Sequence, residues 1–185
     1  MQSLPRRKSP RLKEYDYRQA GAYFVTICTV KRLELFGTIN DGVMALSPLG
    51  QIASEELLSL PARWQSIDLD ACVVMPNHVH AIIVIEADAQ DGKNAVPTDG
   101  SAADAKNRVP TDPSATPSLG SIVGNYKAGV TRFARSANLI DDAQSIWQTR
   151  YHDHIIRSEG SLNHIRAYVE QNPARWSEDT FYSVV

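Results

Sequence analysis

The sequence predicts an α+β protein: a ferredoxin-like antiparallel sheet with helices packed on one face. Strand and helix patterns alternate along the chain in the order strand, helix, strand, strand, helix, strand, and one more helix follows. The strand segments are rich in β-branched and aromatic residues, and the helix segments carry apolar residues at helical spacing. A chain of 185 residues with 43% hydrophobic residues can bury one core, so we expect a single domain.

The first predicted elements are a strand and a hairpin. The segment 21–30 (GAYFVTICTV) is apolar at nearly every position, which is typical of a strand buried on both faces. The segments 33–39 and 43–46 predict a hairpin, because the Asp41-Gly42 pair between them is a preferred two-residue turn.

A helix and a second strand pair follow. Ser47 is a good N-cap and Pro48 suits the first helical position, so we expect a helix over about 48–62. The segments 66–75 and 78–85 lie on either side of a Pro-Asn turn and predict two paired strands.

The end of the chain predicts two helices around one strand. The segment 118–137 has a helical pattern, although three glycines weaken it. The segment 150–157 predicts the last strand. Ser158 then caps a final helix, which we expect to end at about Asn172 because Pro173 cannot continue it.

One segment interrupts this pattern. Residues 87–117 are rich in Ala, Asp, Pro, Gly and Ser and lack apolar periodicity, so we expect a flexible insertion. The predicted organisation is one domain, 1–185, with a basic N-terminal arm (1–18), this insertion, and a compact core over about 19–86 and 118–176.

The charge is unevenly distributed along the chain. The net charge is −2, but the arm carries six basic and two acidic residues, which gives it +4. Such an arm is either a solvated tail or a contact for nucleic acid. We find no apolar run near the ~20 residues of a membrane span and no signal-peptide pattern at the start, and we expect a cytoplasmic protein with no membrane partner. Cys28 and Cys72 lie in apolar strands, which predicts reduced, buried thiols.

The most informative motif is His78-Val79-His80 at the start of a predicted strand. Alternate side chains of a strand point to the same face, so both imidazoles approach one point. Two histidines can contribute to a metal site, but a third ligand must come from elsewhere. The following residues are apolar on both faces, which indicates a central strand where unpaired imidazoles are costly. An accidental histidine pair is the alternative.

The other histidines carry less information. His152 and His154 flank a charged residue, Asp153, so the opposite face of that strand cannot be core there, and we expect a half-exposed edge. His164 lies on a predicted helix, and no motif includes it.

A second pair of residues lies on the last predicted helix. Tyr168 and Asn172 are four residues apart and are therefore neighbours beside the apolar stripe. An ordinary interpretation is also open, in which the tyrosine lies at the core margin and the asparagine ends the helix before Pro173.

Together these segments resemble the single-tyrosine HUH transposases of insertion sequences. The motif His78-Val79-His80 after Met-Pro-Asn matches that family, and Tyr168 with Asn172 matches its nucleophile and amide ligand. The segments YDYRQAGAYFVTICT, WQTRYHDHIIR and YVEQNP resemble the branch of REP-associated tyrosine transposases. The similarity spans about 15–86 and 118–176 and implies the HUH endonuclease fold, which is ferredoxin-like.

The resemblance also implies a reaction. His78, His80 and Asn172 would hold a divalent metal, Mg²⁺ or Mn²⁺, at the scissile phosphate. Tyr168 would attack that phosphate and form a 5′-phosphotyrosine, and a 3′-hydroxyl could later reverse the step. This chemistry is DNA transposition or the processing of REP elements. The sequence offers no motif for the general base that takes the proton of Tyr168.

The DNA partner would be a single strand or a hairpin, bound by a monomer or a homodimer, and the protein would be associated with the nucleoid. Phosphate neutralisation and base stacking need cations and aromatic rings. The candidates are Arg6, Arg7, Lys8, Arg11, Tyr15 and Tyr17 of the arm and Lys127 and Arg132 of the middle helix, where Arg135 adds to the stripe.

Two alternatives stay open. Histidine-triad nucleotide hydrolases also alternate histidines with hydrophobic residues, but Ile82 stands where their motif needs a third histidine. The other alternative is a non-catalytic nucleic-acid-binding regulator descended from a transposase.

Overall fold

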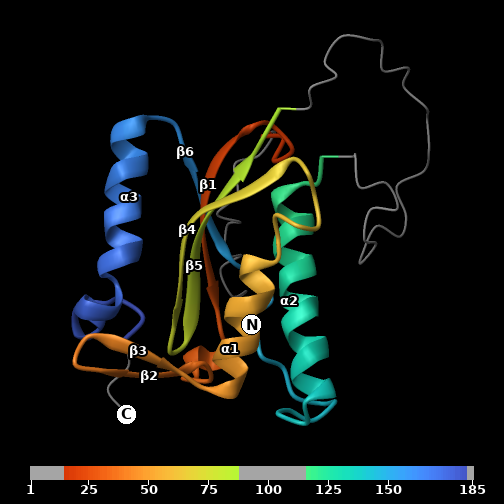
Figure 1. Cartoon of the computed structure of the whole chain (residues 1–185), viewed down its shortest axis with the longest axis vertical. Coiled ribbons are helices and arrows are strands. Elements are labelled where there is room, and N and C mark those ends of the chain that lie inside the picture. The colour runs from red at the N-terminus through yellow and green to blue at the C-terminus, as the bar shows by residue number, and fades with distance from the viewer. Residues whose placement is uncertain (1–14, 88–115, 183–185) are drawn as a thin grey trace, which may run out of the picture.

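The structure is a computed structural model that describes residues 15–87 and 116–182, and every element predicted from the sequence within these ranges is present (Figure 1). The strands of the described residues are β1 (Gly21–Cys28), β2 (Gly37–Asn40), β3 (Val43–Leu46), β4 (Ile67–Met75), β5 (His78–Ile85) and β6 (His152–Ile156). The helices are α1 (Pro48–Leu58), α2 (Leu119–Ser136) and α3 (Glu159–Gln171), with two 3-10 segments, η1 (Val30–Arg32) and η2 (Pro173–Glu178).

The ends of some elements differ from the prediction. The first helix ends at Leu58 and not near residue 62, and the first strand of the hairpin begins only at Gly37. The predicted flexible insertion lies, apart from its ends, outside the described residues, as do residues 1–14 of the basic arm. Cys28 and Cys72 are free thiols; Cys28 is buried as predicted, whereas Cys72 is only half-buried, and burial raises the pKa of each.

The main sheet has four antiparallel strands in the order β4-β5-β1-β6. In this order β5 lies between β4 and β1, and β6 pairs with the other side of β1. That is the ferredoxin-like arrangement of a split βαβ motif. The predicted α+β class and the antiparallel sheet are therefore confirmed.

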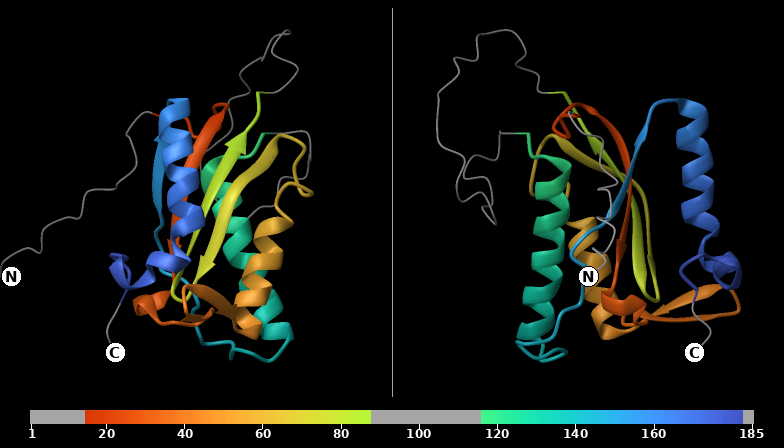
Figure 2. Two further views of the ribbon diagram at one scale, coloured as in Figure 1. Left: turned by 60° about the vertical axis from the view of Figure 1, so that its left-hand side comes forward. Right: turned by 180° about the vertical axis from the view of Figure 1, so that it is seen from behind.

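Helices cover both faces of the sheet. Figure 2 shows α1 and α2 on one side and α3 on the opposite side, so the predicted packing of helices on one face holds for α1 and α2 and not for α3. The reason is the alternation of side chains in β5. Val79, Ala81 and Ile83 join the core under α1 and α2, whereas His78 and His80 point to the face that α3 covers.

The core between the sheet and α1–α2 holds the large apolar side chains. Tyr23, Ile83 and Ile122 are at most 1% exposed, and each such side chain contributes about 1.5–3 kcal/mol by burial. Tyr126 of α2 donates a hydrogen bond to the carbonyl of Ala53 at 3.0 Å and so fixes α2 against α1. This core makes the sheet a rigid support for the opposite face.

The hairpin β2–β3 forms a separate two-stranded sheet. Asp41 and Gly42 both have positive φ, 50° and 77°, as the predicted two-residue turn requires. The turn lies against the 3-10 segment η2, because a Cβ at Gly42 would be only 3.2 Å from Cα of Ala174.

Candidate metal and nucleophile site

The two histidines of β5 lie side by side on the face of the sheet that α3 covers. They follow the tight turn at Asn77, and both are almost fully buried, at 0% and 1% exposure. Their Nε2 atoms are 2.9 Å apart. The predicted convergence of His78 and His80 on one point is thus present in the structure.

Neighbouring polar groups orient the imidazole of His78. Its Nδ1 lies 2.8 Å from Oδ1 of Asn77, and the Asn77 amide nitrogen donates to the carbonyl of Phe181 at 2.8 Å. Oδ1 of Asn77 can only accept, so Nδ1 of His78 carries the proton and Nε2 keeps its lone pair. A lone pair at Nε2 is what a metal ligand requires.

The second imidazole is held from β1. Nδ1 of His80 lies 2.9 Å from the hydroxyl of Thr26, and the ring of Phe24 stacks on the His80 ring at 5.1 Å. Burial lowers the pKa of both histidines to about 3, with Arg32 adding to the effect at His78 and the neighbouring imidazole adding to it at His80. Both rings are therefore neutral at pH 7, as metal ligands must be.

Helix α3 brings the predicted nucleophile to this pair. The hydroxyl of Tyr168 lies 3.3 Å from Nε2 of His80, and the Tyr168 side chain is 39% exposed. Arg166 fixes the helix to β4 by a two-pronged ion pair with Asp70, whose pKa it lowers. Tyr168 therefore combines a hydroxyl at the histidines with an exposed face.

Asn172 lies one turn further along α3, at its C-terminal end, and is 3% exposed. Its amide nitrogen donates to Oδ2 of Asp179 at 3.0 Å. Its Oδ1 is buried and has no hydrogen-bond partner among the described residues. The structure thus brings Tyr168 and Asn172 to the histidines, as the helical spacing predicts.

Asp179 is a site residue that sequence reasoning missed. Its Oδ2 accepts hydrogen bonds from Tyr168 at 3.4 Å and from Asn172, and its Oδ1 accepts from the amide of Phe181 at 2.7 Å. Burial and the carboxylate of Asp179 raise the pKa of Tyr168, so the phenol is protonated at pH 7. The only local signal for Asp179 is a carboxylate that caps the turn after η2, and such turns are common.

The segment after α3 closes one side of the site. Phe181 packs on the ring of His78 at 4.7 Å, and Trp176 lies 6.0 Å from the same ring. Arg32 of η1 lies over Phe181 at 5.0 Å. Beside Tyr168 this segment leaves a cavity of about 240 Å³, lined also by Asn172 and Asp179. A small charged group can enter there next to the hydroxyl.

These residues fit a divalent metal ion. One ligand atom each of His78, His80 and Asp179 lie within 4.8 Å of one another. Two neighbouring ligands at right angles around one ion are about 3.0 Å apart, close to the 2.9 Å between the Nε2 atoms. The unpaired Oδ1 of Asn172 adds a buried acceptor beside this group. The oxygen ligands suit Mg²⁺ or Mn²⁺, although the imidazoles also accept other metals.

The predicted DNA contacts fall into three groups. Arg6, Arg7, Lys8 and Arg11 lie outside the described residues. Tyr15 and Tyr17 are half-buried and pack on Tyr23, with ring centroids 6.5 and 6.1 Å away. These two tyrosines thus contribute to the core and keep only part of their rings open to a base.

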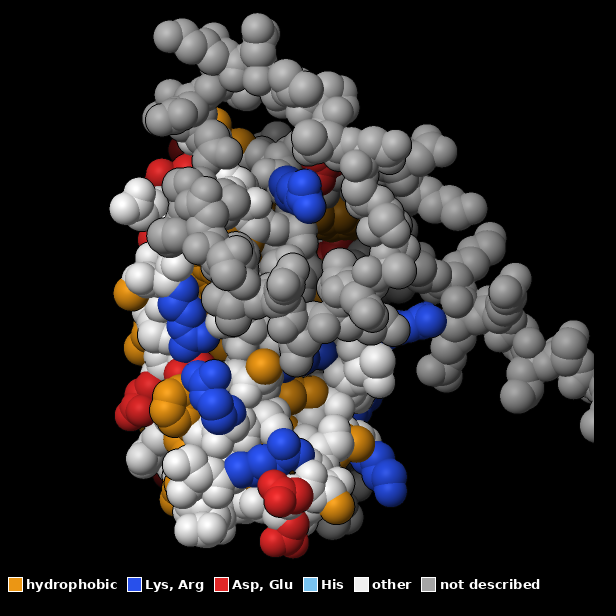
Figure 3. Space-filling model, turned by 90° about the vertical axis from the view of Figure 1, so that its right-hand side faces the viewer, with side chains coloured by type: hydrophobic (Ala, Val, Ile, Leu, Met, Phe, Trp, Pro, Cys, Tyr) orange, Lys and Arg blue, Asp and Glu red, His pale blue; other side chains and the backbone are white. Residues whose placement is uncertain are grey.

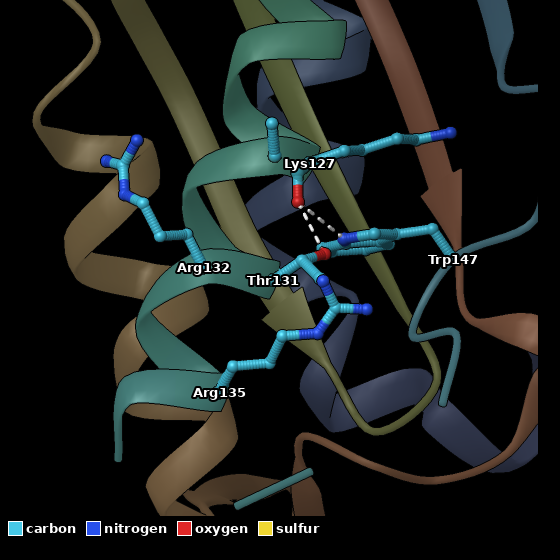
Figure 4. Close-up of a pocket in the computed structure, with 6 residues that line it drawn as sticks. Lys127, Thr131, Arg132, Arg135 and Trp147 are labelled. Carbon is cyan, nitrogen blue, oxygen red and sulfur yellow. Dashed lines mark hydrogen bonds between the residues drawn. The ribbon is translucent and has the colours of Figure 1, made fainter. Parts of the chain in front are cut away.

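Lys127 and Arg132 form the third group, on α2 at the far side of the sheet from the histidines. Figure 3 shows that side of the molecule, where basic side chains lie among apolar ones. Both residues line a pocket of about 440 Å³ with Arg135 and Trp147 (Figure 4). Lys127 donates to the carbonyl of Gln148 at 2.8 Å, and burial lowers its pKa to about 8. Arg132 is exposed and lies over the ring of Phe133.

A search against protein-family models finds no match. An uncharacterised protein of Haemophilus influenzae is 38% identical over 176 residues, which cover 95% of this chain and 93% of that protein. In the described part of the chain, no helix has the length and apolarity to cross a membrane.

A solved structure shares the fold. The structure of a REP-associated tyrosine transposase bound to a REP hairpin matches 90% of this chain and 73% of its own, with a TM-score of 0.56 and 17% identity. A candidate transposase of Deinococcus radiodurans is more distant, with a TM-score of 0.46 and 17% identity over 86% of this chain and 95% of its own. The chain therefore belongs to the same family as the Haemophilus influenzae protein, and its fold is that of a REP-associated tyrosine transposase.

Proposed function

We propose that this chain is a metal-dependent, single-strand DNA endonuclease and strand transferase, that is, a tyrosine transposase of the HUH type. The observation that supports this most directly is Tyr168, a residue that is 39% exposed and whose hydroxyl lies 3.3 Å from His80, beside two neutral histidines. The solved structure that shares the fold is a tyrosine transposase with a bound REP hairpin. This likeness supports DNA, as a single strand or a hairpin, as the partner of the present chain.

In the proposed reaction, the oxygen of Tyr168 attacks a DNA phosphorus atom. The new bond is a phosphotyrosine to the 5′ side, and the bond from phosphorus to the 3′ oxygen breaks, which releases a 3′-hydroxyl. The phosphodiester energy is conserved, so a second 3′-hydroxyl can displace Tyr168 and join the strands. Cleavage and rejoining then need no nucleotide cofactor.

The proton of the phenol needs an acceptor, because the pKa of Tyr168 is raised and not lowered. Asp179 already accepts a hydrogen bond from that hydroxyl at 3.4 Å. We propose Asp179 as the group that receives the proton or orients it during attack. Asn172 holds the same carboxylate in place through its amide nitrogen.

The metal site would use His78 and His80 together with Asn172 or Asp179. A bound Mg²⁺ or Mn²⁺ would polarise the scissile phosphate and neutralise its charge. The buried Oδ1 of Asn172 supports the amide as a ligand, and the distances around Asp179 support the carboxylate.

Binding of the DNA strand would use the basic arm, with Arg6, Arg7, Lys8 and Arg11, and the exposed Arg132 on α2. The compact catalytic part would be 19–86 and 118–182, longer than the predicted 118–176 because Asp179 contacts Tyr168, with 87–117 as a linker that cleavage does not need. The active form would be a monomer or a homodimer, and mass measurement of the DNA complex distinguishes the two.

The test is a covalent-adduct assay. A labelled DNA hairpin with single-stranded flanks is incubated with the full chain and Mn²⁺, then run on a denaturing gel. We expect a labelled protein band that Tyr168→Phe abolishes. Tyr182→Phe is the matched control, because Tyr182 is 40% exposed and Tyr168 is 39% exposed, and this variant should still form the band.

Two outcomes separate the alternatives. If Tyr168→Phe still forms the adduct, the nucleophile is another tyrosine, and Tyr151 is the next candidate because Tyr126 is fully buried. If the wild-type chain binds the hairpin but never forms an adduct, the protein is the non-catalytic regulator and the proposed reaction is wrong.

A further inference from the structure

Strand β6 carries two histidines that the proposed reaction does not use. It is an edge strand of the sheet and pairs with β1. His152 and His154 are exposed, whereas Asp153 between them and Ile155 are half-buried. The expected half-exposed edge is thus present, and the exposed side of the strand consists of the two imidazoles.

The strand register places these histidines on the face of the metal and nucleophile site. Thr26 of β1 is the partner of His80 on one side and of His152 on the other. Phe24 of β1 is in the same way the partner of His154. Partners in adjacent antiparallel strands point to the same face of a sheet. A row of side chains therefore crosses the sheet from His80 through Thr26 to His152.

Phe24, which lies between the two histidine pairs, contacts the proposed nucleophile Tyr168. Phe24 stacks on His80, and its ring centroid lies 6.1 Å from that of Tyr168. Since neighbouring strands are about 4.8 Å apart, His152 lies about 10 Å from His80 across the sheet. A nucleic acid strand with one phosphate at Tyr168 passes over β6 if it leaves the site across this row.

The charge along β6 favours such a path. Arg150 and Arg157, on either side of the strand, are both exposed. The one carboxylate of the strand, Asp153, pairs with Val25 and so lies on the opposite face, towards α2. Hydrogen-bond donors therefore dominate this edge of the site.

We propose that this face of β6 binds the DNA strand next to the scissile phosphate, with His152 and His154 donating hydrogen bonds to the neighbouring backbone phosphates. The inference rests on the proposed function, because it extends the path of the same strand. Imidazole N–H groups donate to phosphate oxygens whether the ring is neutral or charged. The competing explanation is that polar residues on an edge strand only prevent pairing with other chains.

The experiment measures DNA binding without turnover. Full-length Tyr168→Phe protein is added in increasing amounts to a fluorescent DNA hairpin with single-stranded flanks, in a buffer that contains Mn²⁺. The histidine substitutions are made in this protein. We expect His152→Ala and His154→Ala each to weaken binding about tenfold, and His152→Arg to retain most of it. His164→Ala is the matched control, because His164 is exposed on α3 and belongs to no part of the row.

A phosphate scan tests direct contact. Each phosphate of the single-stranded flanks is replaced in turn by a neutral methylphosphonate. At one or two positions beside the phosphate that forms the adduct, the substitution should weaken binding by the Tyr168→Phe protein. It should leave unchanged the binding by the same protein that also carries His152→Ala. If phosphate replacement and the histidine substitution lower the binding affinity additively at every position, the proposal is wrong. It is also wrong if the histidine variants bind DNA normally but aggregate.

The readouts distinguish this inference from the proposed reaction. If the wild-type chain forms an adduct, and the histidine variants bind as tightly as the Tyr168→Phe protein in which they are made, the reaction stands and the role of β6 is wrong. If no adduct forms but the variants and the phosphate scan behave as expected, β6 is a DNA-binding surface and the reaction is wrong.

Discussion

The Nε2 atoms of His78 and His80 lie 2.9 Å apart at the beginning of one buried strand. Two neutral imidazoles in this position are either bridged by one proton or held by one ion. The hydroxyl of Tyr168 lies 3.3 Å from the second of these atoms, although 88 residues separate it from His80 in the chain.

Mn²⁺ should bind to the purified, metal-free chain and raise its thermal unfolding midpoint, because an ion that binds the folded state stabilises it. His80→Ala should lose this shift and lose cleavage, and it should retain most DNA binding. Titration calorimetry and the melting curve measure the first two effects, and fluorescence anisotropy measures the third. Equal loss of binding and cleavage would indicate that His80 is structural. His164→Ala should behave as the wild type.

The metal-free protein should lose stability as the pH falls from about 6.5 towards 3. Burial lowers the pKa of His78 and His80 to about 3 in the folded state. The unfolded chain therefore binds protons that the folded chain does not, and the free energy of unfolding falls with pH across this window.

The slope of this pH dependence can reach about 1.4 kcal/mol per pH unit for each histidine. Urea unfolding at pH 7, 6 and 5 with a chelator measures it, and His80→Gln should flatten it. An unchanged slope in His80→Gln, with His164→Gln as the control, would contradict burial as the cause.

Asp179→Asn should weaken Mn²⁺ binding about 10- to 100-fold. It should also lower the pKa of Tyr168 in the metal-free protein, because the carboxylate helps to raise it. Calorimetry gives the affinity, and ultraviolet titration of the phenol gives the pKa. The matched control is Glu178→Gln: Glu178 precedes Asp179 in the chain, pairs with Arg175 and is not among the proposed metal ligands. If both variants bind Mn²⁺ equally, Asp179 is not part of the metal site.

Two glycines of α2 should respond in opposite ways to alanine. A Cβ at Gly129 would lie 1.9 Å from Oε2 of Glu56, a buried carboxylate that Arg63 holds, so Gly129→Ala should cost about 1–3 kcal/mol. At Gly124 nothing lies within 4 Å, and alanine there should add about 0.5–1 kcal/mol. Urea unfolding compares them, and equal stability of the two variants would contradict the packing of Glu56 against α2.

Two of the three basic residues that line the α2 pocket, Arg132 and Lys127, should have different roles. Arg132→Gln should reduce the salt dependence of DNA binding by about one unit of slope. Lys127→Met should lower the unfolding midpoint, because it removes the bond to Gln148, and should leave the salt slope unchanged. Fluorescence anisotropy at several salt concentrations measures the slope, and a melting curve measures the unfolding midpoint. An unchanged slope in Arg132→Gln would exclude that residue from the DNA interface.

The sequence by itself determined the elements and part of the site. Turn chemistry at Asp41-Gly42, the capping of α1 by Ser47 and the alternation in β5 are local effects, so they could be predicted from adjacent residues. The same alternation predicted that His78 and His80 converge. Helical spacing predicted that Tyr168 and Asn172 are neighbours.

Only the tertiary structure decided which face each helix covers and which residues complete the site. Helix α3 lies on the histidine face because β6 is at the edge of the sheet and Arg166 pairs with Asp70 on β4. Neither the edge position nor the ion pair can be recognised from neighbouring residues in the sequence. Asp179 reaches Tyr168 through the fold of the chain after α3. The register of β6 turned His152 and His154 from an edge feature into neighbours of the site, because strand pairing between distant segments depends on burial over the whole sheet.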